Sequence, residues 1–328
     1  MKKVLEVKSL HTSFDTIGKT IYPVDNVSLE VREGEIVGIV GESGCGKSML
    51  ASSIIRLLPE NAVLKGESVN LNGLDLLKLS EKEISKIRGD MLTMVFQDPL
   101  TFLNPVMTIE KQLSECYRLH SGASKKEAHE RVIEVLNQVG IPAPERVAQS
   151  YAFELSGGMR QRVLIAMAII CNPVMMIADE PTTALDVTVQ EQILQLLKKL
   201  VREKNISMLL ITHDMGIVAD TCDRIYVMYC GQVVESGTTE DIFYRPAHTY
   251  TKKLLESVLT ITEKREELMT INGFVPDIMN LPQGCRFSTR CPYASANCDQ
   301  KPELYEVSPG HFARCFRCRM EAEDEKAT

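Results

Sequence analysis

Residues 35–48 read Glu-Ile-Val-Gly-Ile-Val-Gly-Glu-Ser-Gly-Cys-Gly-Lys-Ser, and this stretch decides the fold. Its first six residues are rich in β-branched side chains, as in a strand buried on both faces of a parallel sheet. The next eight fit the pattern G-x-x-x-x-G-K-[ST] and lead into a helical period at 47–58, the context that a phosphate-binding loop requires. The stretch therefore predicts a nucleoside triphosphate site, and the alternative is a glycine-rich turn before a helix.

The glycines of this loop let backbone N–H groups point inward at phosphate oxygens, and the helix that follows adds a positive dipole end. Lys47 would neutralise the β- and γ-phosphates, and Ser48 would ligate Mg²⁺. The thiol of Cys45 has no expected chemical part. The loop as a whole is expected to hold the nucleotide through Gly41, Ser43, Gly44, Cys45, Gly46, Lys47, Ser48 and Met49.

A second apolar run, 174–178, ends in the carboxylates Asp179 and Glu180. Ligands of open α/β sheets bind at the carboxyl ends of the strands. Asp179 would hold Mg²⁺ directly or through water, and Glu180 would orient and polarise an attacking water. A charge pair at a helix start is the alternative for these two residues.

Short buried strands alternate with amphipathic helices along the chain, which indicates βαβ units, a parallel sheet and an α/β fold. Further buried strands are expected at 91–96 and 208–212, and helices at 109–119, 125–139, 157–170 and 187–204. Half-buried antiparallel strands are expected at 4–10 and 24–31, and another β segment at 224–234. Beyond about residue 240 the pattern becomes irregular. The expected organisation is one domain over 1–240 and an appended extension over 241–328.

The chain has 328 residues, of which 37 are Lys or Arg and 44 are Asp or Glu, giving a net charge of −7. That balance disfavours nucleic acid as a partner. The N-terminus lacks the apolar core of a signal peptide, and the apolar stretch 163–178 is shorter than the roughly 20 residues that span a bilayer. We therefore expect a cytosolic protein, in which clustered cysteines more often bind metal than form disulfides.

Cysteines are crowded near the C-terminus. Of the ten in the chain, five are Cys285, Cys291, Cys298, Cys315 and Cys318. Only the last two have the close C-x-x-C spacing, and four thiolates can hold either an iron–sulfur cluster or zinc. Cys-Pro at 291–292 also occurs beside cluster ligands of bacterial ferredoxins. Both metals stay open, and unliganded thiols or a disulfide are the alternative.

Residues 155–161, Leu-Ser-Gly-Gly-Met-Arg-Gln, resemble the LSGGQ signature of ATP-binding cassette (ABC) ATPases, with Met159 in place of Gln. Gln97 resembles the Q-loop glutamine, 184–186 resembles the D-loop, and His213 resembles the switch histidine. With the phosphate loop and the carboxylate strand, these motifs occur in the family's order over about residues 4–240.

The resemblance implies a P-loop (RecA-like) ABC nucleotide-binding domain with antiparallel β and helical subdomains, the latter at about 99–165. It implies an ATPase domain that meets a second such domain head to tail, on a related but different chain or on a second copy of this one. The catalytic residues would be Glu180, His213 and Gln97, and Mg²⁺ would lie at Ser48, Gln97 and Asp179. Ser156, Gly157 and Gly158 would bind the partner's nucleotide. Adenine would stack on Phe14 or Tyr22.

Residues 245–257 and 284–292 resemble the C-terminal extension of dipeptide/oligopeptide importer ATPases, most closely the dipeptide type. In that family four cysteines bind a [4Fe–4S] cluster, and by position these are Cys285, Cys291, Cys298 and Cys315. Zinc remains the alternative metal, and Cys318 leaves the fourth ligand open.

The implied function is ATP hydrolysis that powers peptide uptake, at the cytoplasmic face of the membrane as a peripheral subunit. The implied partners are a second ABC ATPase subunit, two transmembrane permeases and an extracytoplasmic peptide-binding protein. Nickel chelates, glutathione and oligosaccharides are alternative cargoes. A non-transport ABC ATPase, or a cassette that senses redox state or iron through the extension, are alternatives of another class.

Overall fold

The structure is a computed structural model that describes residues 2–183, 185–257 and 271–319. Its elements form two compact units. The first comprises Met1–Leu5, Val31–Ile36 and Asn70–Ile211, and the second comprises Glu6–Glu30, Val37–Val69 and Thr212–Thr328. The fold class is mixed α/β, as the sequence predicts. The domain boundary at residue 240 stays a prediction.

Three parallel strands form the core of the first unit, in the order β7-β8-β9. They span Leu92–Val95, Met175–Asp179 and Ser207–Ile211. Every residue of β8 and β9 is buried, which explains why both strands are apolar apart from Asp179 and Ser207. A short hairpin, β5 (Ser68–Leu71) and β6 (Leu74–Asp75), lies at the start of this unit.

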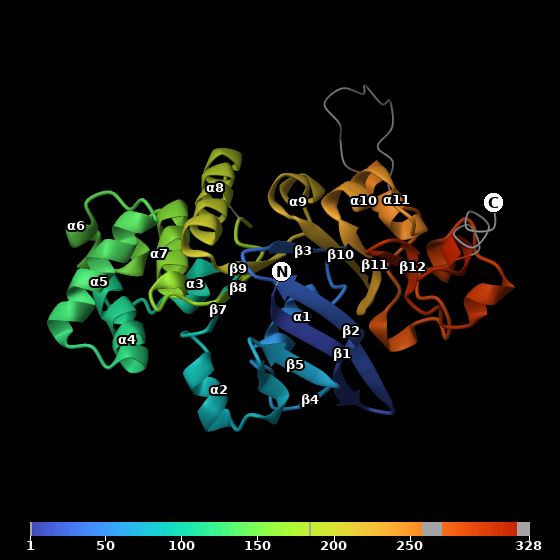
Figure 1. The fold of residues 1–328 in the computed structure, drawn as a ribbon, viewed down its shortest axis with the longest axis horizontal. Coiled ribbons are helices and arrows are strands. Elements are labelled where there is room, and N and C mark those ends of the chain that lie inside the picture. The colour runs from blue at the N-terminus through green and yellow to red at the C-terminus, as the bar shows by residue number, and fades with distance from the viewer. Residues whose placement is uncertain (1, 184, 258–270, 320–328) are drawn as a thin grey trace. The chain divides into compact units, whose positions relative to one another are not determined.

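Seven helices of the first unit carry the rest of its core. They are α2 (Glu81–Ile87), α3 (Pro99–Phe102), α4 (Ile109–Ser121), α5 (Lys125–Gln138), α6 (Pro144–Ala148), α7 (Gly157–Ile169) and α8 (Val187–Lys204). The green helices α4 to α7 gather into one cluster in Figure 1. On α5 the buried residues Ala128, Val132 and Val135 recur at helical spacing, so one stripe of this helix faces the cluster.

The second unit holds β1 (Lys3–Thr16) and β2 (Lys19–Arg32), which pair as a long hairpin, with β4 (Ala62–Lys65) antiparallel to β1. A second group of strands follows the order β3-β10-β11-β13-β12. These are Ile36–Val40, Arg224–Tyr229, Gln232–Thr238, His311–Ala313 and Tyr305–Ser308. The helices are α1 (Lys47–Ile54), α9 (Met215–Thr221), α10 (Thr239–Tyr244) and α11 (Thr249–Glu256).

Three differences from the sequence prediction have local causes. The β segment expected at 224–234 is two strands, because Cys230 and Gly231 adopt positive φ angles of 44° and 83° and turn the chain. The helix expected at 47–58 ends at Ile54, and Arg56 has a φ of 57°. The region beyond 240 is not irregular throughout, because α10, α11, β12 and β13 form there and β13 pairs with β11.

The described part of the chain contains no helix that is both long enough and apolar enough to cross a bilayer.

Candidate functional site

The phosphate loop of the second unit connects the buried strand β3 to α1, as the sequence predicts. Its glycines are required by close backbone approach: a Cβ on Gly41 would lie 2.2 Å from the Met228 carbonyl oxygen, and one on Gly46 would lie 2.1 Å from that of Pro23. Gly46 also has a φ of 102° at the N-cap of α1. No other residue type fits these two positions without moving the chain.

Lys47 is buried, and its Nζ donates to the carbonyl oxygens of Gly41 at 2.8 Å and Glu42 at 3.1 Å. The ammonium therefore lies inside the loop, where a phosphate group would be held. Ser48 follows at the start of α1 and is exposed. Cys45 is buried, and burial raises the pKa of its thiol, so it is not a reactive thiolate.

In the first unit, Asp179 and Glu180 stand at the carboxyl end of β8. Asp179 is 5% exposed. Gln97 Nε2 donates to Glu180 Oε2 at 3.1 Å, and Thr183 Oγ1 donates to the same oxygen at 2.9 Å. The structure thus brings Gln97 and Glu180 together from motifs 83 residues apart.

Glu180 also has a φ of 47°, and its N–H donates to the carbonyl oxygen of Ile211 at 2.9 Å. A non-glycine residue in this conformation is strained, and such strain occurs often at functional sites. The contact with Thr183 was missed by the sequence reasoning. Thr183 lies three residues after Glu180, between the carboxylate strand at 174–180 and the D-loop at 184–186, and no pattern marked it.

Ser156 caps α7 in the first unit, where its Oγ accepts a hydrogen bond from the Met159 N–H at 3.4 Å. Ser156 and Gly157 are exposed, so the N-terminal end of α7 is open to a ligand. Gly158 serves packing: a Cβ there would lie 2.7 Å from Val189 Cγ1 on α8. Asp186 caps α8 through the Val189 N–H, and Ala184 lies outside the described residues.

Three further predicted residues lie in the second unit. His213 is exposed in the turn before α9, and the side chain of its neighbour Asp214 caps that helix. Phe14 on β1 and Tyr22 on β2 stand in the hairpin, where Phe14 is half-buried opposite Ala62 and Tyr22 is 41% exposed. Tyr22 directly precedes Pro23, whose carbonyl oxygen packs against Gly46.

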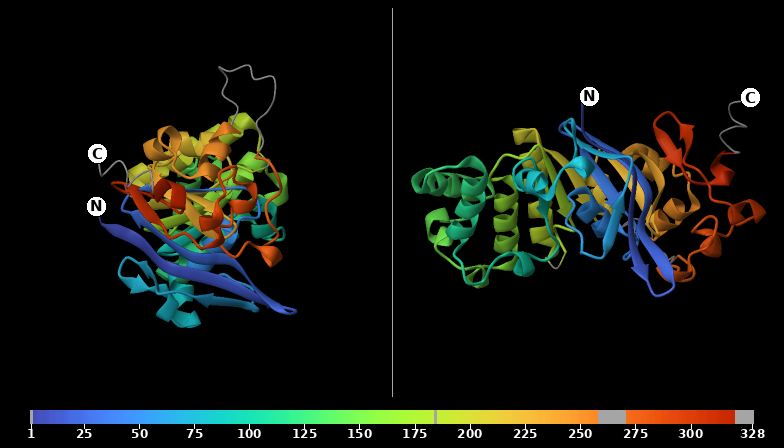
Figure 2. Two further views of the ribbon diagram at one scale, coloured as in Figure 1. Left: turned by 90° about the vertical axis from the view of Figure 1, so that its right-hand side faces the viewer. Right: turned by 90° about the horizontal axis from the view of Figure 1, so that it is seen from below.

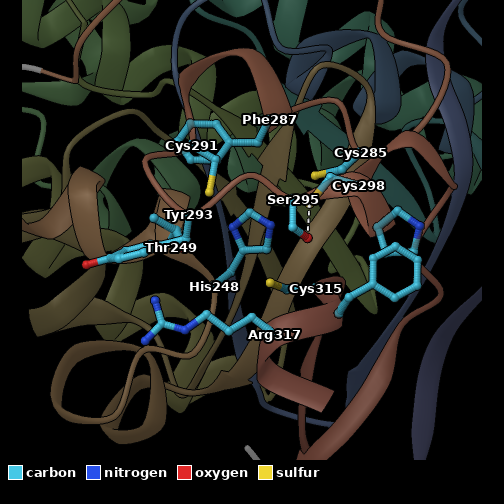
Figure 3. A pocket seen from close by; sticks show the side chains of 12 residues that line it. His248, Thr249, Cys285, Phe287, Cys291, Tyr293, Ser295, Cys298, Cys315 and Arg317 are labelled. Carbon is cyan, nitrogen blue, oxygen red and sulfur yellow. Dashed lines mark hydrogen bonds between the residues drawn. The ribbon is translucent and has the colours of Figure 1, made fainter. Parts of the chain in front are cut away.

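Cys285, Cys291, Cys298 and Cys315 line one small cavity of about 40 Å³ in the second unit (Figure 3). They come from two stretches of the sequence, 285–298 and 315, and His248 and Phe287 line the same cavity. Burial raises the pKa of Cys285 to about 11, with the neighbouring cysteines adding to the shift. Ser295 Oγ lies 3.9 Å from Cys298 Sγ.

The four thiols of this cavity match the donor set of a four-cysteine cluster or zinc site. Within residues 2–183, 185–257 and 271–319, no three His, Cys, Asp or Glu side chains already stand in metal-binding positions. The four cysteines therefore share one cavity and have a suitable donor type, but their side chains do not stand as a metal-binding group. Cys318 lies apart, buried with its Sγ 3.1 Å from the Ala247 carbonyl oxygen.

The other cysteines have ordinary surroundings. Cys222 and Cys230 are buried, and Cys116 and Cys171 are half-buried free thiols that share a side-chain hydrogen bond. These positions agree with small core residues, except that the last pair is partly open to solvent.

The helix cluster of the first unit carries a groove of about 690 Å³ along α4 and the start of α5. Its lining is mostly charged, with Lys111, Arg118 and Lys125 among it, and Leu119 is 77% exposed there. A groove of this size can accept a helix or loop of another chain.

Two family descriptions match the chain. Residues 24–183 match the family described as "ABC transporter", and residues 234–298 match "Oligopeptide/dipeptide transporter, C-terminal region". The chain is 47% identical over 325 residues to the dipeptide transport ATP-binding protein DppD of Bacillus subtilis, covering 98% of this chain and 97% of that protein. It is 45% identical to the oligopeptide transport ATP-binding protein OppD of Salmonella typhimurium, covering 96% and 93%.

Solved structures give the same picture. The ATP-binding cassette MJ0796, determined as a dimer in a post-hydrolysis state with ADP and phosphate, matches with a TM-score of 0.64 at 32% identity. The match covers 72% of this chain and 98% of that one.

Proposed function

The chain belongs to the dipeptide/oligopeptide transport ATP-binding proteins of the ABC transporter family, and we propose that it hydrolyses ATP to power uptake of dipeptides or short oligopeptides. One observation carries this proposal: the similarity at 45–47% identity runs through nearly the whole chain, and the extension has its own match to peptide transporters. The cassette fold and its nucleotide motifs supply the chemistry of ATP hydrolysis.

We propose that the motif residues have the roles in binding and hydrolysing MgATP that the family resemblance implies. Lys47 and the loop amides bind the phosphates, and Ser48, Asp179 and Gln97 are the Mg²⁺ residues. Glu180 is the general base for water, supported by its two hydrogen bonds from Gln97 and Thr183. His213 contacts the γ-phosphate. Ser156, Gly157 and Gly158 serve the nucleotide of a second ATPase subunit in a head-to-tail dimer.

Tyr22 is our choice for stacking on adenine. It is more exposed than Phe14, and it precedes the residue whose carbonyl packs on the phosphate loop. Stacking of a base on an aromatic side chain contributes about 1–3 kcal/mol to the binding free energy.

We propose that Cys285, Cys291, Cys298 and Cys315 hold a [4Fe–4S] cluster, with zinc as the alternative. Cys315 rather than Cys318 is the fourth ligand, because Cys315 lines the cavity with the other three. When bound, the group would cross-link segments that have few buried apolar side chains of their own.

The α4 groove supports the proposal that a helix of a membrane permease binds there. In this arrangement the chain works at the cytoplasmic face of the membrane with two permeases, a second ATPase and an extracytoplasmic peptide-binding protein. Nickel chelates, glutathione and oligosaccharides remain the alternative cargoes, since the cargo does not touch this subunit.

The test is uptake by cells that lack this chain. Deletion is expected to abolish uptake of a labelled dipeptide, wild-type chain to restore it, and Glu180→Gln to leave it absent. Uptake of nickel, glutathione and an oligosaccharide is measured in the same cells. If the deletion abolished uptake of nickel, glutathione or the oligosaccharide and left dipeptide uptake intact, the proposed cargo would be wrong. If the deletion changed the uptake of none of the four compounds, the proposed transport function would be wrong.

A further inference from the structure

The C-terminal extension contacts β2 and the turn between β10 and β11 within the second unit. Lys19, at the start of β2 in the hairpin, donates from Nζ to the carbonyl oxygen of Met279. Arg286 pairs with Asp25 on β2 and donates to the carbonyl oxygen of Cys230. The extension and the hairpin lie side by side in Figure 2, right view. None of these three contacts involves a residue of the phosphate loop.

Arg290 makes such a contact. Its guanidinium forms a bidentate pair with Glu42, the second residue of the loop: Nη1 lies 2.7 Å from Oε2, and Nη2 lies 3.1 Å from Oε1. The Arg290 side chain is 3% exposed and that of Glu42 is 25% exposed. A bidentate pair of this kind fixes orientation as well as charge, more firmly than a surface ion pair.

The guanidinium is itself held by the extension and by β10. Arg290 Nε donates to the carbonyl oxygen of Asn272 at 3.1 Å, Nη2 donates to that of Ile271 at 3.2 Å, and Nη1 donates to Tyr229 Oη at 3.4 Å. The guanidinium is therefore fixed in place.

The backbone of Glu42 is also held by hydrogen bonds. Its N–H donates to Tyr250 Oη on α11 at 2.9 Å, and its carbonyl oxygen accepts from Lys47 Nζ at 3.1 Å. The extension thus holds both the side chain and the backbone of one loop residue, and that residue holds the lysine that would bind phosphate. None of the five sequence motifs includes Arg290 or Tyr250.

We propose that Arg290 is a positioning residue for ATP, which fixes the Glu42 side chain and neutralises its carboxylate beside the triphosphate. The proposal rests on the proposed ATP-binding function. Without Arg290, Glu42 would bring an uncompensated negative charge to a loop that must bind a polyanion. Like charges in a partly desolvated site cost far more than in water. The residue stands next to Cys291, so the segment that bears a cavity cysteine also sets the loop.

The experiment measures equilibrium affinity of the full chain for a non-hydrolysable ATP analogue with Mg²⁺. Arg290→Gln is expected to weaken binding about tenfold or more, since one partner of a buried ion pair is lost. Arg290→Lys keeps the charge but loses the bidentate geometry. Its affinity for the analogue is expected to lie between those of wild type and Arg290→Gln. Arg245→Gln is the matched control, because Arg245 lies at an exposed position directly after α10 and pairs with Asp241. The affinity of this variant is expected to match wild type.

The double variant Glu42→Gln/Arg290→Gln separates positioning from general damage. Removing the unpaired carboxylate is expected to restore affinity to within about threefold of wild type. Thermal unfolding of each variant is recorded alongside. Wild-type affinity in a folded Arg290→Gln variant, or a double variant as weak as Arg290→Gln, would overturn the proposal. A wild-type chain that binds no nucleotide would instead overturn the proposed function.

Discussion

Glu235 on β11 links the extension to the rest of the second unit. Removal of the Glu235 side chain gives the sharpest prediction for stability. The side chain is fully buried. Oε1 accepts from the Ala247 N–H at 2.7 Å, Oε2 accepts from the His248 N–H at 2.9 Å, and His311 Nε2 lies 2.7 Å from Oε1. One carboxylate therefore satisfies groups on the approach to α11 and on β13.

Glu235→Ala would leave these three groups buried without an acceptor. Each unsatisfied buried group costs about 1–3 kcal/mol. Breaking a buried pair by removing one partner costs about 3–5 kcal/mol. We expect a loss of about 3–5 kcal/mol in the free energy of unfolding, which is a large part of the roughly 5–15 kcal/mol typical of a folded protein.

The assay is urea unfolding of the full chain, followed by tyrosine fluorescence and far-ultraviolet circular dichroism. Glu256→Ala is the matched control, because Glu256 makes a half-exposed ion pair with Lys253, and such pairs contribute about 0–1 kcal/mol. If Glu235→Ala and Glu256→Ala lost the same small amount, the buried carboxylate would not anchor the extension and the reasoning would be refuted.

Three further predictions concern the loop, the cavity and a helix cap. Gly46→Ala places a Cβ against the Pro23 carbonyl oxygen, whereas the Cβ of Gly44→Ala meets nothing within 4 Å. In urea unfolding, Gly46→Ala is expected to lower the free energy of unfolding by at least about 2 kcal/mol more than Gly44→Ala. Equal losses would contradict the close packing of Gly46. Cys315→Ala is expected to remove at least about half of the iron and sulfide of anaerobically purified protein, while Cys318→Ala retains them. The reverse result would exclude Cys315 as the fourth ligand, and zinc without sulfide would exclude the cluster. Burial acts to raise the pKa of Asp241, but the hydrogen bonds from Thr238 lower that pKa overall. The ionised Asp241 therefore contributes its full stabilisation above the ordinary Asp pKa of about 3.9. This stabilisation is lost as the pH falls through the lower pKa that Asp241 has in the folded protein. Thr238→Val should shrink that acid-dependent loss in pH-dependent unfolding, and an unchanged profile would contradict the cap.

The nucleotide motifs were predictable because each is local. A buried strand, a glycine loop and a helix follow one another within residues 35–54, so chemistry and spacing can be recognised without knowing the fold. The same holds for Ser156 as a helix cap and for Asp179 and Glu180 at a strand end. Of these expectations, the mixed α/β fold is confirmed, while the roles of the site residues stay predictions.

The extension was less predictable for physical reasons. β12 and β13 have only four and three residues, so they show no period that could be recognised. The pair between Arg290 and Glu42 joins residues 248 apart, and no local pattern marks it. The turn at Cys230 was missed because a cysteine with positive φ is not a turn signal, although Gly231 beside it is.

The most direct test of the ATPase account is phosphate release from MgATP by the purified chain and by Glu180→Gln, each measured together with nucleotide binding. The account predicts that Glu180→Gln binds MgATP about as tightly as wild type while its turnover falls by a factor of about 10² or more, because the base that polarises water is gone. Equal turnover in the two proteins would contradict it.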